Sequence, residues 1–219
     1  VLDIIQKMHS SVVMVNVIYQ DGSEGFGTGF IVADGNYALT AAHVIKEAKT
    51  VTLSLPSGEN VVCKIEMAGQ CLVKQTGSGI EKICEVDVGI LRLENKFSSV
   101  NAVELDRDVA KTGEDVLFIG YPGGGLNRIE KLLFNPIPLV TKGIVSGLLR
   151  TSFSDETFEY YFWVDRPSFS GNSGSPVFRV NTGKVTGIIT AAPYMPKKIL
   201  YEDKEHDIYL PDGYAIAFG

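Results

Sequence analysis

Short runs of alternating apolar and polar residues recur along the chain. Val13, Val15, Val17 and Tyr19 occupy every second position of one run, as in a half-buried strand with a period of two residues. Similar β-branched runs, bounded by Gly, Asp, Asn and Pro, predict about a dozen strands, at 12–19, 27–32, 37–40, 51–55, 61–67, 88–93, 116–119, 139–148, 160–165, 175–180, 185–191 and 214–218. Many short strands without intervening helices indicate a barrel or a sandwich rather than βαβ units.

Three other segments depart from this strand pattern. Residues 2–8 place apolar side chains at helical spacing, so a short N-terminal helix is predicted there. The glycine-rich segment 123–138 lacks the Lys-Ser/Thr ending of a phosphate-binding loop and is interpreted as a mobile loop. The charged segment 193–213 is interpreted as a long, solvated polar loop.

A charged stretch at 106–115 divides the predicted strands into two comparable halves. We therefore expect one domain over 1–219, with a first barrel at about 11–105, a linker at 106–115 and a second barrel at about 116–219. A chain of 219 residues with 45% hydrophobic content can bury a sizeable core.

Charge and hydropathy exclude two classes of partner. The formal net charge of −6 and the absence of a local basic patch argue against nucleic-acid binding. No apolar run approaches the roughly 18 residues that a membrane-spanning helix needs. A soluble protein is expected, without an indication of its compartment. Further domains outside this segment and a homo-oligomeric state stay open.

The chain has three cysteines, Cys63, Cys71 and Cys84. An odd number in one stretch is a poor disulfide framework and favours free thiols, although one bridge stays open. Neither a Cys-x-x-Cys spacing nor a nearby histidine suggests a metal site. We expect neither a metal nor a cofactor.

The segment Gly171-Asn172-Ser173-Gly174-Ser175-Pro176 places a serine between two glycines. Taken alone, these residues also suit an ordinary β-turn. The functional interpretation is sharper, because glycine beside a nucleophile lets the backbone N–H groups of Gly171 and Ser173 point at one spot. The oxyanion of a tetrahedral intermediate would lie there.

His43 follows Thr40-Ala41-Ala42, whose small alanines leave a histidine room to reach a neighbouring loop. Asp87 opens the run Asp87-Val88-Gly89-Ile90-Leu91. Each residue alone has an ordinary structural explanation, as a packed histidine or as a residue that starts a strand. Together with Ser173 they occur in the order His, Asp, Ser, with the first two in one half and the serine in the other.

These three segments resemble the signature segments of trypsin-like serine peptidases, over nearly the whole chain. Gly27-Thr28-Gly29-Phe30-Ile31-Val32, Gly143-Ile144-Val145-Ser146 and Gly183-Lys184-Val185-Thr186-Gly187-Ile188 resemble the bacterial HtrA (Do-like) branch. The segment ending at Phe178 is just as similar to staphylococcal glutamyl endopeptidases. The resemblance implies an all-β chymotrypsin-like fold, with two packed six-stranded antiparallel barrels.

The resemblance also implies a serine endopeptidase that acts on extended or unfolded polypeptides. Ser173 would be the nucleophile, His43 the general acid and base, and Asp87 the residue that orients the histidine. The family's oxyanion hole carries over onto the backbone of Gly171, Asn172 and Ser173. Because Asn172 replaces the aspartate that zymogen-activated relatives carry before the nucleophile, activation by N-terminal cleavage is not expected.

The family binds its substrate as an added strand beside Ile188, Ile189, Thr190 and Ala191. The specificity pocket would be lined by this strand and by Pro167, Ser168 and Phe169. None of these residues is acidic and none is a histidine, which argues against Lys/Arg and against Glu preference. An apolar or small side chain at the cleavage site is expected.

Two alternatives compete with the interpretation as a serine endopeptidase. A catalytically latent or inactive protease-fold scaffold would have the same fold, but such relatives usually lose a triad residue, and this chain retains all three. An α/β-hydrolase esterase would need Gly-x-Ser-x-Gly on a strand-to-helix turn and the order Ser, Asp, His, which the chain lacks.

Overall fold

The computed structural model describes the backbone at residues 5, 8–76, 79–123, 137–153, 156–191, 194–201, 204–211 and 215–218. It describes side chains at 5, 8–69, 86–123, 137–148, 161–190 and 217. Within these ranges the regular secondary structure is almost entirely β-strand. The predicted mobile loop at 123–138 falls mostly outside them.

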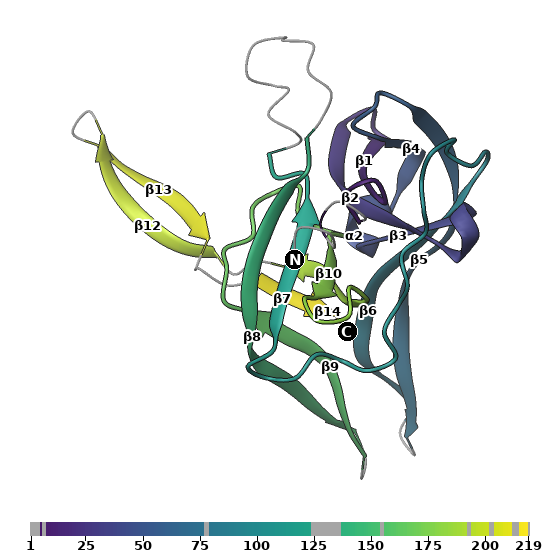
Figure 1. Ribbon diagram of the computed structural model, residues 1–219. Helices are drawn as coiled ribbons and strands as arrows, with labels where there is room; N and C mark the ends of the chain where they lie inside the picture. Colours follow the sequence, from purple (N-terminus) through teal and green to yellow (C-terminus); the bar gives the residue numbers. More distant parts are fainter. Residues whose placement is uncertain are drawn as a thin grey trace.

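Six antiparallel strands close the first barrel, in the order β1-β2-β3-β6-β5-β4 (Figure 1). They are β1 Val12–Tyr19, β2 Glu24–Val32, β3 Tyr37–Thr40, β4 Ala48–Ser54, β5 Asn60–Thr76 and β6 Gly79–Leu93. The 3-10 turn Ala33–Gly35 joins β2 to β3, and the short helix α2 (Ala42–Ile45) joins β3 to β4. The barrel closes because β1 pairs with both β2 and β4.

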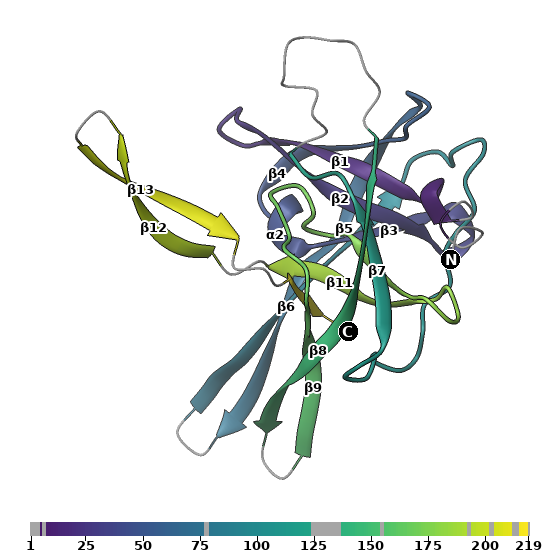
Figure 2. The same ribbon diagram turned by 60° about the vertical axis from the view of Figure 1, so that its left-hand side comes forward.

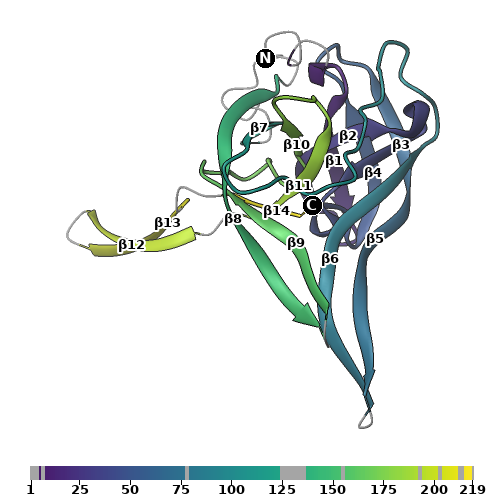
Figure 3. The same cartoon turned by 60° about the horizontal axis from the view of Figure 1, so that its bottom comes forward.

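Six further strands close the second barrel, in the order β10-β11-β14-β9-β8-β7. They are β7 Asp115–Gly120, β8 Leu139–Phe153, β9 Glu156–Val164, β10 Pro176–Arg179, β11 Val185–Ala191 and β14 Ala215–Phe218. The two barrels lie side by side in all three views (Figures 1, 2 and 3). The predicted pair of six-stranded antiparallel barrels is confirmed.

Each barrel has an apolar interior of its own. The first is filled from its strands and from α2 by residues such as Val15, Ile31, Leu53 and Leu91. Among the side chains that the structure describes, those that fill the second include Phe118, Phe162, Val164 and Val177. Burial of each such side chain stabilises the fold by roughly 1.5–3 kcal/mol.

A third cluster lies between the barrels. Phe30 and Val12 of the first barrel pack there with Leu117, Tyr121 and Phe178 of the second. The Tyr121 hydroxyl donates to Val12 O at 3.1 Å, and burial raises the pKa of this phenol, so the proton stays in place as a donor. The interface is therefore both apolar and anchored by a hydrogen bond across it.

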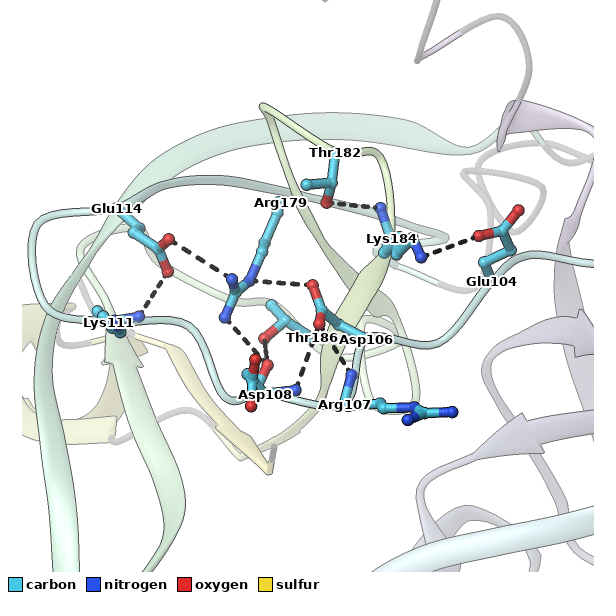
Figure 4. A network of polar contacts seen from close by, with 10 residues as sticks. All are labelled: Glu104, Asp106, Arg107, Asp108, Lys111, Glu114, Arg179, Thr182, Lys184 and Thr186. Atoms are coloured by element: carbon cyan, nitrogen blue, oxygen red, sulfur yellow. Dashed lines mark hydrogen bonds and ion pairs between the residues drawn. The ribbon is translucent and has the colours of Figure 1, made fainter.

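The connection between the barrels runs from the end of β6 at Leu93 to the start of β7 and includes the predicted linker 106–115. Arg179 of β10 holds this connection (Figure 4). Its Nε is 3.4 Å from Asp106 Oδ2 and its Nη1 is 3.6 Å from Glu114 Oε1. Its Nη2 donates to Asp108 O at 3.0 Å, and the Thr186 hydroxyl donates to the same oxygen at 3.0 Å. We call this group of five residues the linker junction.

Long hairpins extend beyond the barrels. The β5–β6 ladder continues to the pair Thr76↔Gly79, and the β8–β9 ladder continues to Phe153↔Glu156. Figures 1 and 2 show both hairpins reaching the same end of the molecule. The predicted strands stopped short of these extensions, because polar residues and glycines interrupt the apolar pattern there.

The interpretation of 193–213 as a polar loop was wrong. This segment forms a separate two-stranded sheet, β12 (Tyr194–Tyr201) and β13 (Lys204–Pro211), which leaves the end of β11 and returns to β14. Figure 1 shows the hairpin projecting from the second barrel. Tyr and Ile residues lie on both sides of its charged blocks in the sequence, and Tyr and Ile favour extended backbone.

The structure describes only part of the predicted N-terminal helix. Its described residues, Ile5 and Met8, are helical, as is His9 directly after them. Cys63 is a free, buried thiol whose pKa is raised to about 12, mainly by burial. The backbones at Cys71 and Cys84 are paired with Glu85 and Leu72, not with each other. In the part of the chain that is described, no helix is long and apolar enough to cross a bilayer.

Candidate active site

His43 lies on α2, directly after β3. Its Nδ1 is 2.7 Å from Asp87 Oδ2, and its backbone N–H donates to Asp87 Oδ1 at 2.8 Å. With Nδ1 facing a carboxylate, the neutral imidazole carries its proton on Nδ1. Nε2 is then left as a proton acceptor, which is the form that a general base requires.

The position of α2 depends on two contacts. A Cβ on Gly89 would lie 2.6 Å from Ile45 Cδ1, so glycine at this place in β6 lets the helix lie close to the strand that carries Asp87. From the other side, the Tyr19 hydroxyl donates to Val44 O at 3.1 Å. Burial raises the pKa of Tyr19, so this donor keeps its proton. These contacts fix the helix that presents His43.

Ser173 lies in the loop between β9 and β10, between two glycines with positive φ. Gly171 has φ +98° and Gly174 has φ +90°, a region that residues with a Cβ rarely adopt. A Cβ on Gly171 would lie 2.2 Å from Tyr121 O, and one on Gly174 would lie 2.0 Å from Thr28 O. Both glycines are therefore needed for the loop to fit between β2 and the end of β7.

The loop of Ser173 and the helix of His43 meet at the start of β2. The Thr28 N–H donates to Ser173 O at 2.8 Å. A Cβ on Gly27 would lie 2.8 Å from Val44 Cγ1 and 3.0 Å from Ser173 O. The fold thus places the three predicted triad residues around one point where the barrels touch. Among the residues that the structure describes, none is hydrogen-bonded to Ser173 Oγ.

The backbone donors of the nucleophile loop divide into two groups. The N–H of Asn172 donates to Phe169 O at 3.0 Å, and the N–H of Gly174 donates to Ile189 O at 2.7 Å. The N–H groups of Gly171 and Ser173 have no acceptor among the described residues. Two donors are therefore available for a developing oxyanion, whereas the N–H of Asn172, which the family resemblance also suggested, is already engaged.

Asn172 and its neighbours form a tightly packed polar cluster beneath this loop. A Cβ on Gly120 would lie 2.0 Å from Ser175 Oγ, 2.7 Å from Asn172 Oδ1 and 3.1 Å from Thr28 Oγ1. Ser175 and Thr28 are fully buried, and Asn172 nearly so. Glycine at 120 therefore lets β7 lie close against the nucleophile loop.

The predicted specificity residues lie on the two segments that border the loop. Ser168 is buried, whereas Phe169 is 52% exposed beside the candidate oxyanion donors. Ile188, Ile189 and Thr190 are buried in β11. Pro167 is partly buried, and the side chain of Ala191 lies outside the described residues.

Backbone pairing restricts where a substrate strand could be added. Ile188 pairs with Pro176 on one side and with Phe218 on the other. Ile189 N–H donates to Ser175 O at 2.9 Å, and Ile189 O accepts from Gly174. The backbones of Ile188 and Ile189 are therefore engaged within the second barrel, which narrows the predicted segment 188–191 toward its C-terminal end.

Sequence reasoning missed residues that hold this site together. Thr28 and Tyr121 both bond to the nucleophile loop or to its supports, although they are far from it in the chain. In the sequence, Thr28 stands out only as part of the motif Gly27-Thr28-Gly29, which resembles the HtrA branch. A hydroxyl residue between two glycines is the only local feature that points to a role for Thr28.

The ionisable groups of the candidate triad are the Asp87 carboxylate and the His43 imidazole, which are paired with each other. In the described part of the chain, no group of three or more His, Cys, Asp or Glu residues is arranged to hold a metal ion. The His43 side chain is 49% exposed and that of Asp87 is 24% exposed. The arrangement can remove a proton from a neighbouring hydroxyl and stabilise the resulting imidazolium.

Comparison with known proteins assigns the chain to a family. Residues 27–188 match the family model described as a trypsin-like peptidase domain. A probable periplasmic serine endoprotease DegP-like of Pseudomonas putida (strain W619) is 30% identical over 170 residues, which are 77% of this chain and 29% of that protein. The periplasmic pH-dependent serine endoprotease DegQ of Escherichia coli (strain K12) is 28% identical over 169 residues, 77% of this chain and 31% of DegQ. The chain thus spans about a third of the length of these relatives.

Solved structures show the same fold. The HtrA-type protease AlgW with tripeptide has a TM-score of 0.67 at 22% identity, over 99% of this chain and 58% of that one. The active form of the Rv3671c protease from M. tuberculosis has a TM-score of 0.66 at 21% identity, over 98% of this chain and 78% of that one. The match over 27–188, together with the sequence relatives, shows that the chain belongs to the trypsin-like peptidase family, with DegP-like and DegQ serine endoproteases among its relatives.

Proposed function

We propose that this domain is a serine endopeptidase that cleaves extended polypeptides through an acyl-enzyme on Ser173. The observation that carries the proposal is the His43–Asp87 pair beside a glycine-flanked serine loop with two unengaged N–H groups. A nucleophile, a base held in one tautomer and two oxyanion donors are the parts that acyl transfer needs.

In the acylation step, Ser173 Oγ attacks the carbonyl carbon of the scissile peptide. His43 Nε2 takes the hydroxyl proton as the new C–O bond forms, and the ionised Asp87 stabilises the imidazolium. The carbonyl oxygen becomes an oxyanion that the N–H groups of Gly171 and Ser173 can bind. The C–N bond then breaks, and His43 gives its proton to the leaving amine.

In the deacylation step, a water molecule takes the place of the amine. His43 removes one proton from the water as its oxygen attacks the ester carbonyl, which forms a second oxyanion in the same place. The bond to Ser173 Oγ breaks, and the proton returns to that oxygen. The products are a carboxylic acid and the free enzyme. Each of the named residues acts in both halves of the cycle.

We propose that substrates bind as an added strand along the C-terminal end of β11 and place a small or apolar side chain near Ser168. The buried neighbours on β11 are Ile188 and Ile189, and no acidic side chain is among the predicted pocket residues. A lysine or arginine at the cleavage site would lack a counter-charge, which is costly in a desolvated pocket.

The proposal is tested by incubating the purified domain and a Ser173→Ala variant with casein and mapping the cleaved bonds by mass spectrometry. Cleavage by the parent protein alone, after small or apolar residues, is expected. Equal cleavage by both proteins would contradict the role of Ser173, and cleavage mainly after Lys or Arg would contradict the proposed pocket.

A catalytically latent state is the second candidate, because the described contacts leave Ser173 Oγ without a hydrogen bond to His43. Catalytic hydrogen bonds often form only once substrate is bound, so this geometry suits an enzyme as well as a resting state. A latent enzyme would cleave only after an activating partner or peptide is added. An inactive scaffold would not cleave under any condition.

A further inference from the structure

Thr28 of β2 is fully buried where the two barrels meet, and the proposed mechanism gives it no role. All of its polar atoms are bonded to parts of the site. Its N–H donates to Ser173 O at 2.8 Å, and its carbonyl accepts from the Thr40 hydroxyl at 2.6 Å. Its hydroxyl donates to Gly171 O at 2.7 Å and accepts from the Tyr121 N–H at 2.9 Å.

The direction of the bonds at the Thr28 hydroxyl is fixed by chemistry. A backbone N–H can only donate, a carbonyl can only accept, and a hydroxyl has a single proton. The chain of bonds must therefore run from Tyr121 N–H to Thr28 Oγ1, and from Thr28 Oγ1–H to Gly171 O. Only serine or threonine can both accept and donate strongly at this place.

These bonds act on the segment that carries both candidate oxyanion donors. Gly171 has no Cβ, so its peptide planes can rotate at low cost, and rotation would turn its N–H away from the reacting oxygen. Thr28 holds Gly171 O with its hydroxyl and Ser173 O with its N–H. Gly171 O lies in the peptide plane that links residues 171 and 172, and Ser173 O lies in the plane that links 173 and 174. Thr28 therefore restrains both planes that flank the Ser173 N–H, and the plane next to that of the Gly171 N–H.

The same residue is also tied to the segment that carries the base. Thr40, whose hydroxyl binds the Thr28 carbonyl, lies three residues before His43 in the chain. One buried residue of the first barrel therefore bonds to the His43 segment, to the nucleophile loop and to the end of β7. A displacement of one of these parts would be opposed by bonds to the other two.

We propose that Thr28 is a positioning residue that holds Gly171 and Ser173 in the geometry of the oxyanion hole. The proposal rests on the proposed endopeptidase function. In this proposal the Thr28 hydroxyl does not contact the substrate. It affects the transition state indirectly, through its hydrogen bond to Gly171 O. Its loss should reduce kcat rather than substrate affinity, because donors aimed at an oxyanion act mainly in the transition state.

The test compares Thr28→Val, which keeps the shape but lacks the hydroxyl, with Thr28→Ser, which keeps the hydroxyl. We expect kcat for a peptide taken from a mapped casein site to fall about 100-fold in the valine variant, the size of a small misplacement in an active site. KM should stay within about threefold. The serine variant should retain kcat within about threefold of the parent protein, because it restores both bonds.

Inhibition by a peptide aldehyde with the sequence of the same site distinguishes an oxyanion-hole effect from a general packing defect. Its adduct with Ser173 carries an oxygen in the oxyanion position, so its inhibition constant should rise about 100-fold in Thr28→Val. Affinity of the uncleaved peptide, measured in a Ser173→Ala background with and without Thr28→Val, should be unchanged. Unchanged kcat and aldehyde inhibition in Thr28→Val would overturn the proposal, as would equal losses in the valine and serine variants.

If Thr28→Val does not fold, Thr28→Ser and Thr28→Cys serve as the matched pair, because they differ by one atom and sulfur is a weak donor and acceptor. The serine variant should exceed the cysteine variant in kcat by at least tenfold, and equal values would overturn the proposal. Failure of the parent protein itself to cleave the peptide or bind the aldehyde would instead contradict the endopeptidase function. The two failures are therefore distinct.

Discussion

The polar contacts at Thr28 and those of the linker junction both bind the second barrel to another part of the chain, but with different groups. Thr28, Thr40, Tyr121, Gly171 and Ser173 form what we call the nucleophile junction, which is joined by neutral hydrogen bonds of 2.6–2.9 Å. The linker junction joins a guanidinium to carboxylates at 3.4 and 3.6 Å.

The two junctions also differ in exposure. Thr28 and Thr40 are fully buried, whereas the side chains of Arg179, Asp106 and Glu114 are 12%, 15% and 28% exposed. Neutral groups can be buried at low cost if every one is bonded, and their bonds are directional. Charged groups attract over a wider range of geometries and keep some contact with water. The comparison indicates that the nucleophile junction sets active-site geometry and the linker junction sets stability.

The largest expected effect is on catalysis alone. Asp87→Asn should reduce kcat about 10⁴-fold, because the amide favours the wrong imidazole tautomer. In the parent protein, the backbone N–H and the Nδ1 of His43 bind different oxygens of the Asp87 carboxylate. An asparagine has only one side-chain oxygen, so it can accept only one of these two bonds. Peptide hydrolysis measures the loss, and a thermal midpoint within about 2 °C of the parent protein is the expected control. A variant with more than a tenth of the parent kcat would remove Asp87 from the mechanism.

The next effect separates the two junctions. Arg179→Met removes the charge that faces Asp106 and Glu114, and we expect the free energy of unfolding to fall by about 2 kcal/mol, between the values for exposed and buried pairs. Denaturant unfolding measures this change. The folded variant should keep kcat and aldehyde inhibition within about twofold, because the linker junction has no bond to Gly171 or Ser173.

A matched surface pair provides the control for Arg179. Lys142 Nζ is 2.9 Å from Asp115 Oδ2, but the side chains are 52% and 53% exposed. Lys142→Met should change the free energy of unfolding by less than about 1 kcal/mol. If both variants lose the same stability, partial burial is not what makes the linker junction important. If Arg179→Met instead reduces kcat more than tenfold, the separation between the junctions fails.

The smallest expected effect is chemical. Iodoacetamide at pH 8 should leave Cys63 unmodified in the folded protein, because its thiol is buried and its pKa is raised to about 12. In denaturant the same thiol should react readily, as peptide mass spectrometry can show. Rapid modification of the native protein would indicate that the first barrel opens near β5.

Much of the architecture follows from local sequence pattern. The observed limits of Val12–Tyr19, Tyr37–Thr40 and Val185–Ala191 are the predicted ones. Each is a short run that contains β-branched or aromatic residues and has turn-forming residues near it in the sequence. The β12–β13 hairpin was missed because its charges resemble those of a solvated loop. Its ladder depends on pairing between strands, such as Lys198↔Asp207, which composition does not reveal.

The candidate site also contains residues that local motifs predict and residues that only the folded structure reveals. Ser173, His43 and Asp87 could be proposed because each has a recognisable local motif. The role of Thr28 depends on carbonyls 143 and 145 positions further along the chain, at Gly171 and Ser173. The engagement of the Asn172 N–H likewise depends on the conformation of the folded loop. Contacts of this kind follow from tertiary structure, and a single sequence has no periodicity that predicts them.

The central claim is that Ser173 is an activated nucleophile at the contact between the barrels. Treatment with a fluorophosphonate, followed by peptide mass spectrometry, tests it most directly, because only an activated hydroxyl is labelled. The account predicts one covalent adduct, on Ser173, which is absent in Ser173→Ala and strongly slowed in Asp87→Asn. Absence of labelling under conditions in which trypsin is fully labelled, or an adduct on another residue, would contradict it.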